Sequence, residues 1–287
     1  MHRVRRGVRV DAEEWADAGF VARYATRMRA VAATRHHEPV FSHVSAAIEW
    51  GLPIVGPHLQ HVHLAADGRR GVHSKNGVVW YHDAITTDDV VERRGVLVTS
   101  LERTVRDVAC MLPFASAVAV LDHVFRDWIE LPDGTRDRGI DQDRFVYELV
   151  VGASRRGVRG ARAAAAFADP AAESPGESVS RAHMHVMHFP APVLQARFPR
   201  ADGSGDDVSD FDWPELDRFG EFDGVGKYIR EEFTRGRSTA DVVLDEKRRE
   251  DRIRRHRSHA VRWDWRIALS PRLLREHLIA HGIHPTR

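Results

Sequence analysis

The chain has 287 residues, of which 43% are hydrophobic and 30% charged, so it is long enough for two packed domains and too apolar to be disordered throughout. Lys plus Arg (43) nearly balance Asp plus Glu (42), so the net charge by itself indicates no nucleic-acid partner. The single cysteine, Cys110, excludes an intrachain disulfide and fits a reducing cytoplasm. No signal-peptide pattern and no apolar run near ~20 residues is present, so we expect neither export nor membrane insertion.

Residues 1–130 are expected to form an α+β domain with a small sheet and packed helices. Helices are predicted over 20–36 and after Ser42, which can cap the second. Thr99 and Glu102 form a capping box that predicts a further helix, and the apolar spacing that follows predicts another. The β-rich stretches that predict the sheet are "HVHLAADGRRGVH" (61–73), "GVVWYH" (77–82) and "GVLVTS" (95–100).

Residues 131–170 are turn-rich and then alanine-rich, and we expect a helical linker that ends at Pro170. The second domain, 171–287, is expected to follow the order helix, three strands, helix, strand, helix. The predicted ranges are 174–188, 193–199, 207–213, 217–223, 241–257, 259–266 and 271–281.

The stretch "SDFDWPELDRFGEFDGVGKY" (209–228) carries acids on two predicted strands. Side chains alternate along a strand, so Asp210 and Phe211 project from opposite faces of the sheet. The short connection "PEL" should place Asp210 near Glu221 on the next strand. Facing like charges cost up to ~1 kcal/mol per pair unless a cation neutralises them. The acids are therefore either ligands of a hard divalent ion, Mg²⁺ or Mn²⁺, or a hydrated surface hairpin. Lys227, after two glycines, could stabilise charge at the same place.

Several motifs in order resemble the PD-(D/E)xK-type nuclease-like domain related to very-short-patch-repair endonucleases. They are "ESPGES", "VLQARF", "SDFDWPE", "GEFDGVGKY" and "DEKRREDRIRRHRSHAVRWDW", and the resemblance covers about 173–270. It implies an α/β restriction-endonuclease-like (α-β-β-β-α-β) core and a metal-dependent phosphodiesterase site that acts on DNA.

By this resemblance, Asp210 and Glu221 are the metal ligands, and we expect Asp223 to hold the metal with them. Asp223 stands where the family usually has lysine, so that role would pass to Lys227 or Lys247. If neither lysine reaches the ion, the domain binds nucleic acid without cutting it.

Two other charged features have alternative interpretations. Glu177 matches the acid that such domains carry on their first helix, but with Ser174 and Pro175 it also fits a helix cap, and we favour capping. The helix "DEKRREDRIRRHR" (245–257) either contacts phosphates or presents a solvated, ion-paired face. Its candidate phosphate contacts are Arg248, Arg249, Arg252 and Arg255. The groups of histidines at 58–63 and 183–188 lack the defined ligand set of a zinc site.

The N-terminal half resembles the antitoxin-like domain of AbiEi-type proteins from abortive-infection systems. The resemblance covers about 38–126 and rests on "SHVSAA", "GLP" and "VTSLERTVRDVA". It implies a role in phage defence or toxin–antitoxin biology with a cognate toxin as partner, although residues 1–37 are short for the winged helix that often accompanies it. We therefore expect a Mg²⁺-dependent DNA endonuclease-like protein. The alternative is a non-catalytic antitoxin or DNA-binding regulator with a degenerate nuclease domain.

Overall fold

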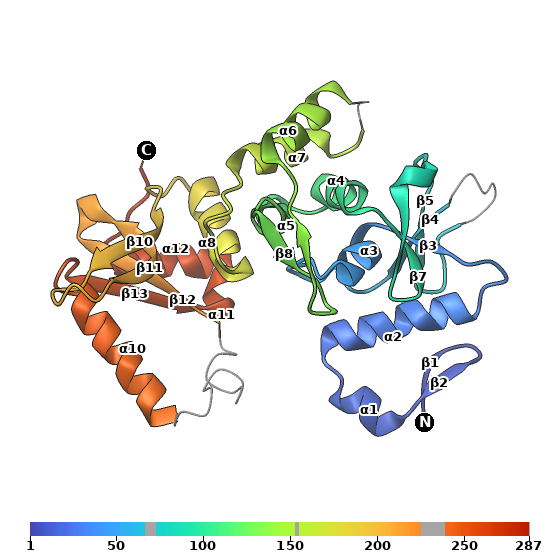
Figure 1. Cartoon of the computed structure of the whole chain (residues 1–287), viewed down its shortest axis with the longest axis horizontal. Coiled ribbons are helices and arrows are strands. Elements are labelled where there is room, and N and C mark those ends of the chain that lie inside the picture. Colours follow the sequence, from blue (N-terminus) through green and yellow to red (C-terminus); the bar gives the residue numbers. More distant parts are fainter. Residues whose placement is uncertain (67–72, 153–154, 225–238, 287) are drawn as a thin grey trace. The chain divides into compact units, whose positions relative to one another are not determined.

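The computed structural model describes residues 1–66, 73–152, 155–224 and 239–286. The chain divides into two compact units, Met1–Ala168 and Asp169–Arg287, and each is a mixed α/β arrangement (Figure 1). The division falls just before Pro170, where the sequence ends the expected linker. Within the described residues, no helix combines the length and the apolar character needed to span a bilayer.

A five-stranded mixed sheet forms the centre of the first unit. Its middle strand runs parallel to β7 and antiparallel to β4. The predicted strands at 77–82 and 95–100 are present as β5 and β7, whereas the middle strand and the edge strand β6 were not predicted. The middle strand has only two residues, and β6 is a half-exposed edge with two charged residues, so neither shows a clear apolar alternation. In spatial order the strands are β5 (Val78–Tyr81), β4 (Val62–Ala65), β3 (Val40–Phe41), β7 (Val96–Thr99) and β6 (Val90–Arg93).

Helices pack around this sheet. The region 131–170, which was expected to be a linker, supplies some of these helices. Helix α7 packs on both α4 and α5, so residues 131–168 are part of the first unit. Within the β-rich stretch 61–73, residues 67–72, which include the Asp-Gly pair expected to form a turn between two strands, lie outside the described residues. The helices are α1 (Ala12–Asp17), α2 (Phe20–Ala33), α3 (His43–Glu49), α4 (Leu101–Met111), α5 (Phe114–Val124), α6 (Gln142–Val151) and α7 (Val158–Phe167). The first unit also contains two separate hairpins. One pairs β1 (His2–Arg5) with β2 (Val8–Val10), and the other pairs β8 (Trp128–Glu130) with β9 (Arg136–Arg138).

The predicted cap of α4 is wrong by one residue. Ser100 is the N-cap and its Oγ accepts from the Arg103 N–H at 3.4 Å. Thr99 instead ends β7 in the sheet, fully buried, and its hydroxyl lies 2.7 Å from that of Thr104. The helix therefore begins one residue later than the capping-box pattern indicates.

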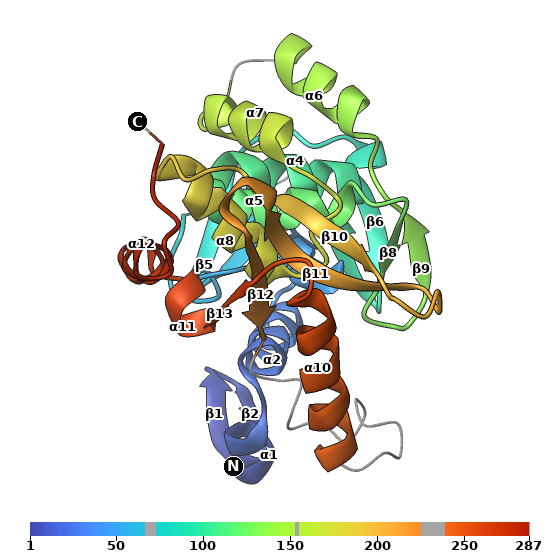
Figure 2. The ribbon, with the colours of Figure 1, turned by 90° about the vertical axis from the view of Figure 1, so that its left-hand side faces the viewer.

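The second unit follows the order helix, three strands, helix, strand. The strands lie in the order β10-β11-β12-β13, antiparallel except for the last pair, which is parallel (Figure 2). Helix α10 connects the parallel pair, as a crossover of this kind requires. The predicted strand over 259–266 ends early, because residues from Trp265 onward turn into a short helix. The elements are α8 (Pro175–Val186), β10 (Val193–Pro199), β11 (Asp206–Trp213), β12 (Arg218–Asp223), α10 (Thr239–Ile253), β13 (His259–Asp264), α11 (Trp265–Ala268) and α12 (Pro271–Ala280).

The two faces of this sheet bury different residues. Phe211, Trp213 and Trp263 pack in one core with side chains from α8 and α12. On the opposite face, Phe219 and the α10 residue Ile253 form a smaller core. The strand alternation therefore places Glu221, two positions from Phe219, on the side covered by α10.

Candidate metal site in the second unit

Asp210 and Glu221 lie opposite each other on neighbouring strands. Phe211 pairs with Gly220 in the antiparallel ladder, so Asp210 and Glu221 are the next facing positions. The Asp210 Oδ2 accepts from the Phe222 backbone N–H at 2.7 Å, which holds this carboxylate against β12. Asp210 raises the pKa of Glu221 through its negative charge. The proximity expected from the "PEL" connection, which is the short 3₁₀ turn Pro214–Leu216, is found.

Glu177, in the first turn of α8, is close enough to Asp210 for the charge of Asp210 to act on it. Ser174 caps the helix, with its Oγ accepting from the Glu177 N–H at 3.2 Å, so the capping expectation for the backbone is confirmed. The Glu177 carboxylate does not close a capping box with Ser174. Its Oε2 accepts from the Glu173 N–H at 2.9 Å and from the Gln195 side-chain amide at 3.1 Å. The charge of Asp210 also acts on this carboxyl, so Glu177 contributes both to the cap and to the acidic site.

Burial makes the charged form of both glutamates costly. It raises the pKa of Glu177 to about 7, and the Asp210 charge adds to the effect. Burial likewise raises the pKa of Glu221 to about 7, with the Asp210 charge adding to it and Arg249 opposing it. Both groups therefore titrate near neutral pH, and a cation placed between these acids would favour their ionised forms.

Gln195 is a site residue that the sequence did not reveal. It lies on β10 between Leu194, which pairs with Phe211, and Ala196, which pairs with Ser209, so it stands across from Asp210. Its backbone φ is +49°, a conformation that typically costs a non-glycine residue about 1–3 kcal/mol. The only sequence signal is an amide within the strand "VLQARF", and nothing there indicates its bond to Glu177.

Among the described residues, the cation that pairs with Glu221 is an arginine, whereas the sequence predicted a lysine. Arg249 on α10 places Nη2 2.7 Å from Glu221 Oε2 and 2.7 Å from Glu246 Oε1. Lys247 is exposed on the same helix, and no contact joins it to Asp210 or Glu221 within the described chain. Lys227 lies outside the described residues.

Asp223 does not join Asp210 and Glu221. Its carboxylate is 39% exposed and lies 3.7 Å from Arg262, which also pairs with Glu246 and Glu250. Across residues 1–66, 73–152, 155–224 and 239–286, no group of three His, Cys, Asp or Glu side chains is arranged to hold a metal ion. A cation here would therefore rest on Asp210 and Glu221, and Mg²⁺ commonly binds through two carboxylates and water.

One oxygen of Glu221 supports a ligand role. Oε2 pairs with Arg249, but Oε1 is buried and has no hydrogen-bond partner among the described residues. A buried carboxylate oxygen without a partner is costly, and native proteins rarely keep one without a reason. The donor set of Asp210 and Glu221 thus fits a hard cation, with Glu177 close by.

The four arginines predicted to contact phosphates divide into two pairs. Arg249 and Arg252 point toward the sheet, and Arg252 makes a bidentate pair with Asp207 at 2.6 and 2.8 Å. Arg248 and Arg255 are exposed, and within the described residues their one ion-pair contact is that of Arg248 with Asp245 at 3.6 Å. Only the exposed pair therefore presents its charge to solvent.

A second polar cluster lies in the first unit, beside a cavity of about 470 Å³. His43, at a left-handed φ of +48°, stacks on Tyr81 with ring centroids 3.4 Å apart. Asp107 is 2% exposed and lies 3.8 Å from His43. Burial lowers the pKa of His43 and of His63 to about 3 each, so both imidazoles are neutral at physiological pH. His63 bonds Tyr81 through Nδ1 at 3.2 Å, which gives it a structural role.

No family model, curated protein or solved structure matches this chain. The functional argument therefore depends on the geometry of the site and on the motifs of the sequence.

Proposed function

We propose that the second unit is a restriction-endonuclease-like domain of the PD-(D/E)xK type that binds Mg²⁺ or Mn²⁺ and hydrolyses phosphodiester bonds in DNA. The observation that carries this proposal is that Asp210 faces Glu221 across neighbouring strands and that its charge acts on Glu177 and Glu221, two buried carboxyls whose pKa values rise to about 7. Clusters of buried acids with displaced pKa values are characteristic of functional sites. The order α8, β10, β11, β12, α10, β13 agrees with the order that the resemblance implies.

Each residue of the site has a part in this proposal. Asp210 and Glu221 would hold the ion, which lowers the pKa of a bound water and offsets negative charge on a phosphoryl oxygen. Gln195 would keep Glu177 directed at the site. Arg249 would supply the positive charge that the family usually takes from lysine.

For the first unit, the support is the AbiEi-type resemblance alone. We propose an antitoxin-like role in phage defence or toxin–antitoxin biology, with a cognate toxin as its partner. The whole chain would then join a regulatory module to a nuclease-like one in the cytoplasm.

The second candidate function is a non-catalytic DNA-binding regulator. Arg249 favours it, because a guanidinium 2.7 Å from Glu221 already neutralises part of the acidic cluster without a metal ion. In that case the acids and arginines would form an internal ion-pair network that stabilises a binding module.

The test is a cleavage assay on the full chain. Plasmid and linear DNA are incubated with Mg²⁺ or Mn²⁺, and binding of Mn²⁺ is measured by calorimetry. We expect Asp210→Asn and Glu221→Gln to abolish both cleavage and ion binding. Asp206→Asn is the matched control, since it removes one exposed carboxylate from the same strand. Cleavage that survives in both site variants would overturn the assignment, and DNA binding without cleavage or ion binding would favour the regulator.

A further inference from the structure

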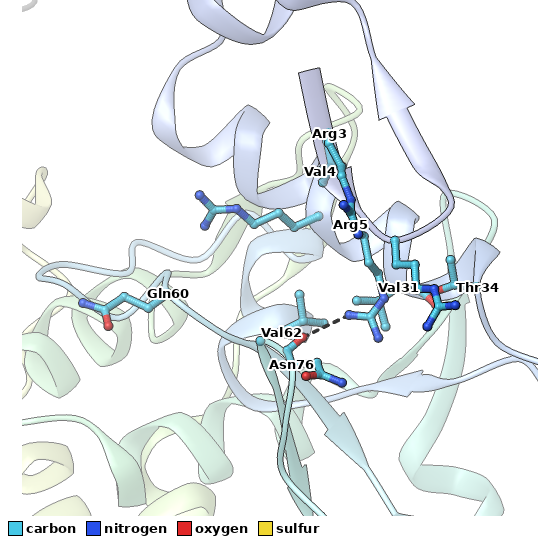
Figure 3. Close-up of a pocket in the computed structure, with 11 residues that line it drawn as sticks. Arg3, Val4, Arg5, Val31, Thr34, Gln60, Val62 and Asn76 are labelled. Atoms are coloured by element: carbon cyan, nitrogen blue, oxygen red, sulfur yellow. Dashed lines mark hydrogen bonds between the residues drawn. The ribbon is translucent and has the colours of Figure 1, made fainter. Parts of the chain in front are cut away.

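A basic pocket of about 840 Å³ lies in the first unit, between the β1–β2 hairpin, α2 and the start of β4. Four arginines line it, three from the hairpin and one from α2, together with neutral polar side chains such as Gln60 and Asn76. Figure 3 shows Arg3 and Arg5 on the hairpin above Val62 and Asn76. The arginines are Arg3, Arg5, Arg6 and Arg27. We call this feature the arginine pocket.

Among the residues that the structure describes, those that line the arginine pocket include no carboxylate. Arg5 donates to the Asn76 carbonyl at 3.1 Å and Arg27 to the Leu59 carbonyl at 3.3 Å, so both are held in place but not neutralised. Throughout the described parts of the chain, none of the four has a carboxylate within ion-pair distance. The described residues therefore offer no carboxylate that compensates the positive charge of the pocket.

This arrangement contrasts with that of several arginines elsewhere in the molecule. Arg103, Arg252 and Arg257 each form a bidentate or close pair with an aspartate, which leaves little charge for a ligand. Four guanidinium groups without such partners repel one another unless an anion enters. The residues that the sequence predicts to contact phosphates nevertheless lie on α10 and not in the arginine pocket.

The chemistry of the lining defines the ligand class. Guanidinium groups bind phosphate oxygens in a bidentate fashion, and several of them together favour a ligand with several negative charges. Gln60, Asn76 and Thr34 add neutral hydrogen-bonding groups, and the volume lies within the range of pockets that hold small molecules. We propose that the arginine pocket binds a phosphate-bearing ligand, either a nucleotide or a stretch of nucleic-acid backbone.

The experiment measures binding by fluorescence anisotropy at low salt, with the full chain. The probes are labelled ATP, a labelled 15-nucleotide single strand and a labelled 15-base-pair duplex, and adenosine tests whether phosphate is required. The test variant is Arg3→Ala with Arg6→Ala, because both side chains are exposed and their loss should not disturb folding. The control is Arg9→Ala with Arg29→Ala, two exposed arginines from the same hairpin and helix that do not line the pocket.

We expect at least one phosphate probe to bind, with the test variant weaker by about 10-fold or more and the control nearly unchanged. For an oligonucleotide, the slope of log affinity against log salt should fall by about two in the test variant. Tight ATP binding identifies a nucleotide as the source of the phosphate, and binding of oligonucleotides alone identifies the backbone. The proposal is overturned if no phosphate probe binds at low salt, if adenosine binds as well as ATP, or if both variants lose affinity equally. Binding in Asp210→Asn should be unaffected, so failure of the nuclease assignment would not affect this result.

Discussion

Arg249 Nη2 lies 2.7 Å from Glu221 Oε2, so that a side chain of α10 reaches across to strand β12 and meets a buried acid of the candidate site. The Arg249 side chain is 26% exposed and that of Glu221 only 7%. The pair is thus mostly shielded from water, and each charge depends on the other more than in a surface salt bridge.

Replacing Arg249 should therefore destabilise the second unit. Arg249→Ala leaves the Glu221 carboxylate buried without its cation, and we expect a loss of about 2 kcal/mol in the free energy of unfolding, measured with urea in the absence of metal. Arg248→Ala removes a 62% exposed arginine from the same helix and should change stability by less than about 0.5 kcal/mol. Equal effects of the two variants would show that the buried pair contributes nothing.

Stability of the metal-free protein should depend on pH through Glu177 and Glu221. Both have a pKa of about 7 in the folded chain against about 4.5 for an ordinary glutamate, so folding favours their protonated forms. The stability that these two raised pKa values give the folded state is fully present below pH 4.5 and is lost as the pH rises from 4.5 through 7. We expect the melting temperature of the second unit, measured in EDTA, to fall by on the order of 5 °C between pH 5 and pH 8.

Two variants separate this effect from general charge repulsion. Glu177→Gln combined with Glu221→Gln should flatten the pH dependence, whereas the exposed Glu215→Gln should leave it intact. Mg²⁺ should raise the melting temperature more at pH 8 than at pH 6, because the ion needs ionised ligands. A double variant that keeps the full pH dependence would place its origin elsewhere.

Gly176 sets the distance between α8 and β12. A Cβ at this position would lie 2.0 Å from Cε1 of Phe222, so Gly176→Ala requires the helix or the ring to move. We expect a loss of about 2 kcal/mol in the stability of the second unit and weaker ion binding, since Glu177 is the next residue. Gly160→Ala in α7 is the control, because its Cβ would meet nothing within 4 Å and alanine favours helix. An unchanged urea midpoint for Gly176→Ala would contradict this close packing.

Sequence patterns predicted the parts of the second unit that depend on local periodicity. The range of β10 was predicted without error, and the alternation along β11 correctly placed Phe211 in a core and Asp210 opposite Glu221. Long-range partners were not predictable, because nothing near Arg249 in the sequence indicates that it meets Glu221. The strained backbone of Gln195 was also missed, since its φ is imposed by tertiary contacts and no glycine marks it. In the first unit, a two-residue strand such as β3 is too short to produce a pattern.

The neutral histidines of the first unit should make it sensitive to acid. Burial lowers the pKa of His43 and His63 to about 3, whereas an ordinary histidine has a pKa of about 6.5, so below pH 6.5 the unfolded chain binds protons that the folded chain does not. The stability that these two neutral histidines give the first unit is therefore fully present above pH 6.5 and is lost as the pH falls from 6.5 toward 3. His63→Gln should reduce this loss in urea titrations at pH 5 relative to pH 7, whereas the exposed His37→Gln should not. Identical acid profiles for the two variants would contradict the assignment.

Asp107 should be the most sensitive acid of the first unit. It accepts from Arg103 Nε at 3.0 Å and from Arg155 Nη1 at 2.8 Å, while Arg103 is itself only 4% exposed. Asp107→Ala removes the charge that balances the buried guanidinium, so we expect a loss of about 3 kcal/mol in the free energy of unfolding of this unit. Asp88→Ala, an exposed acid in the same unit, should cost less than about 0.5 kcal/mol. Urea denaturation followed by tryptophan fluorescence distinguishes the two, and equal midpoints would show that Arg103 is balanced by Asp89 alone, its other carboxylate partner at 3.2 Å.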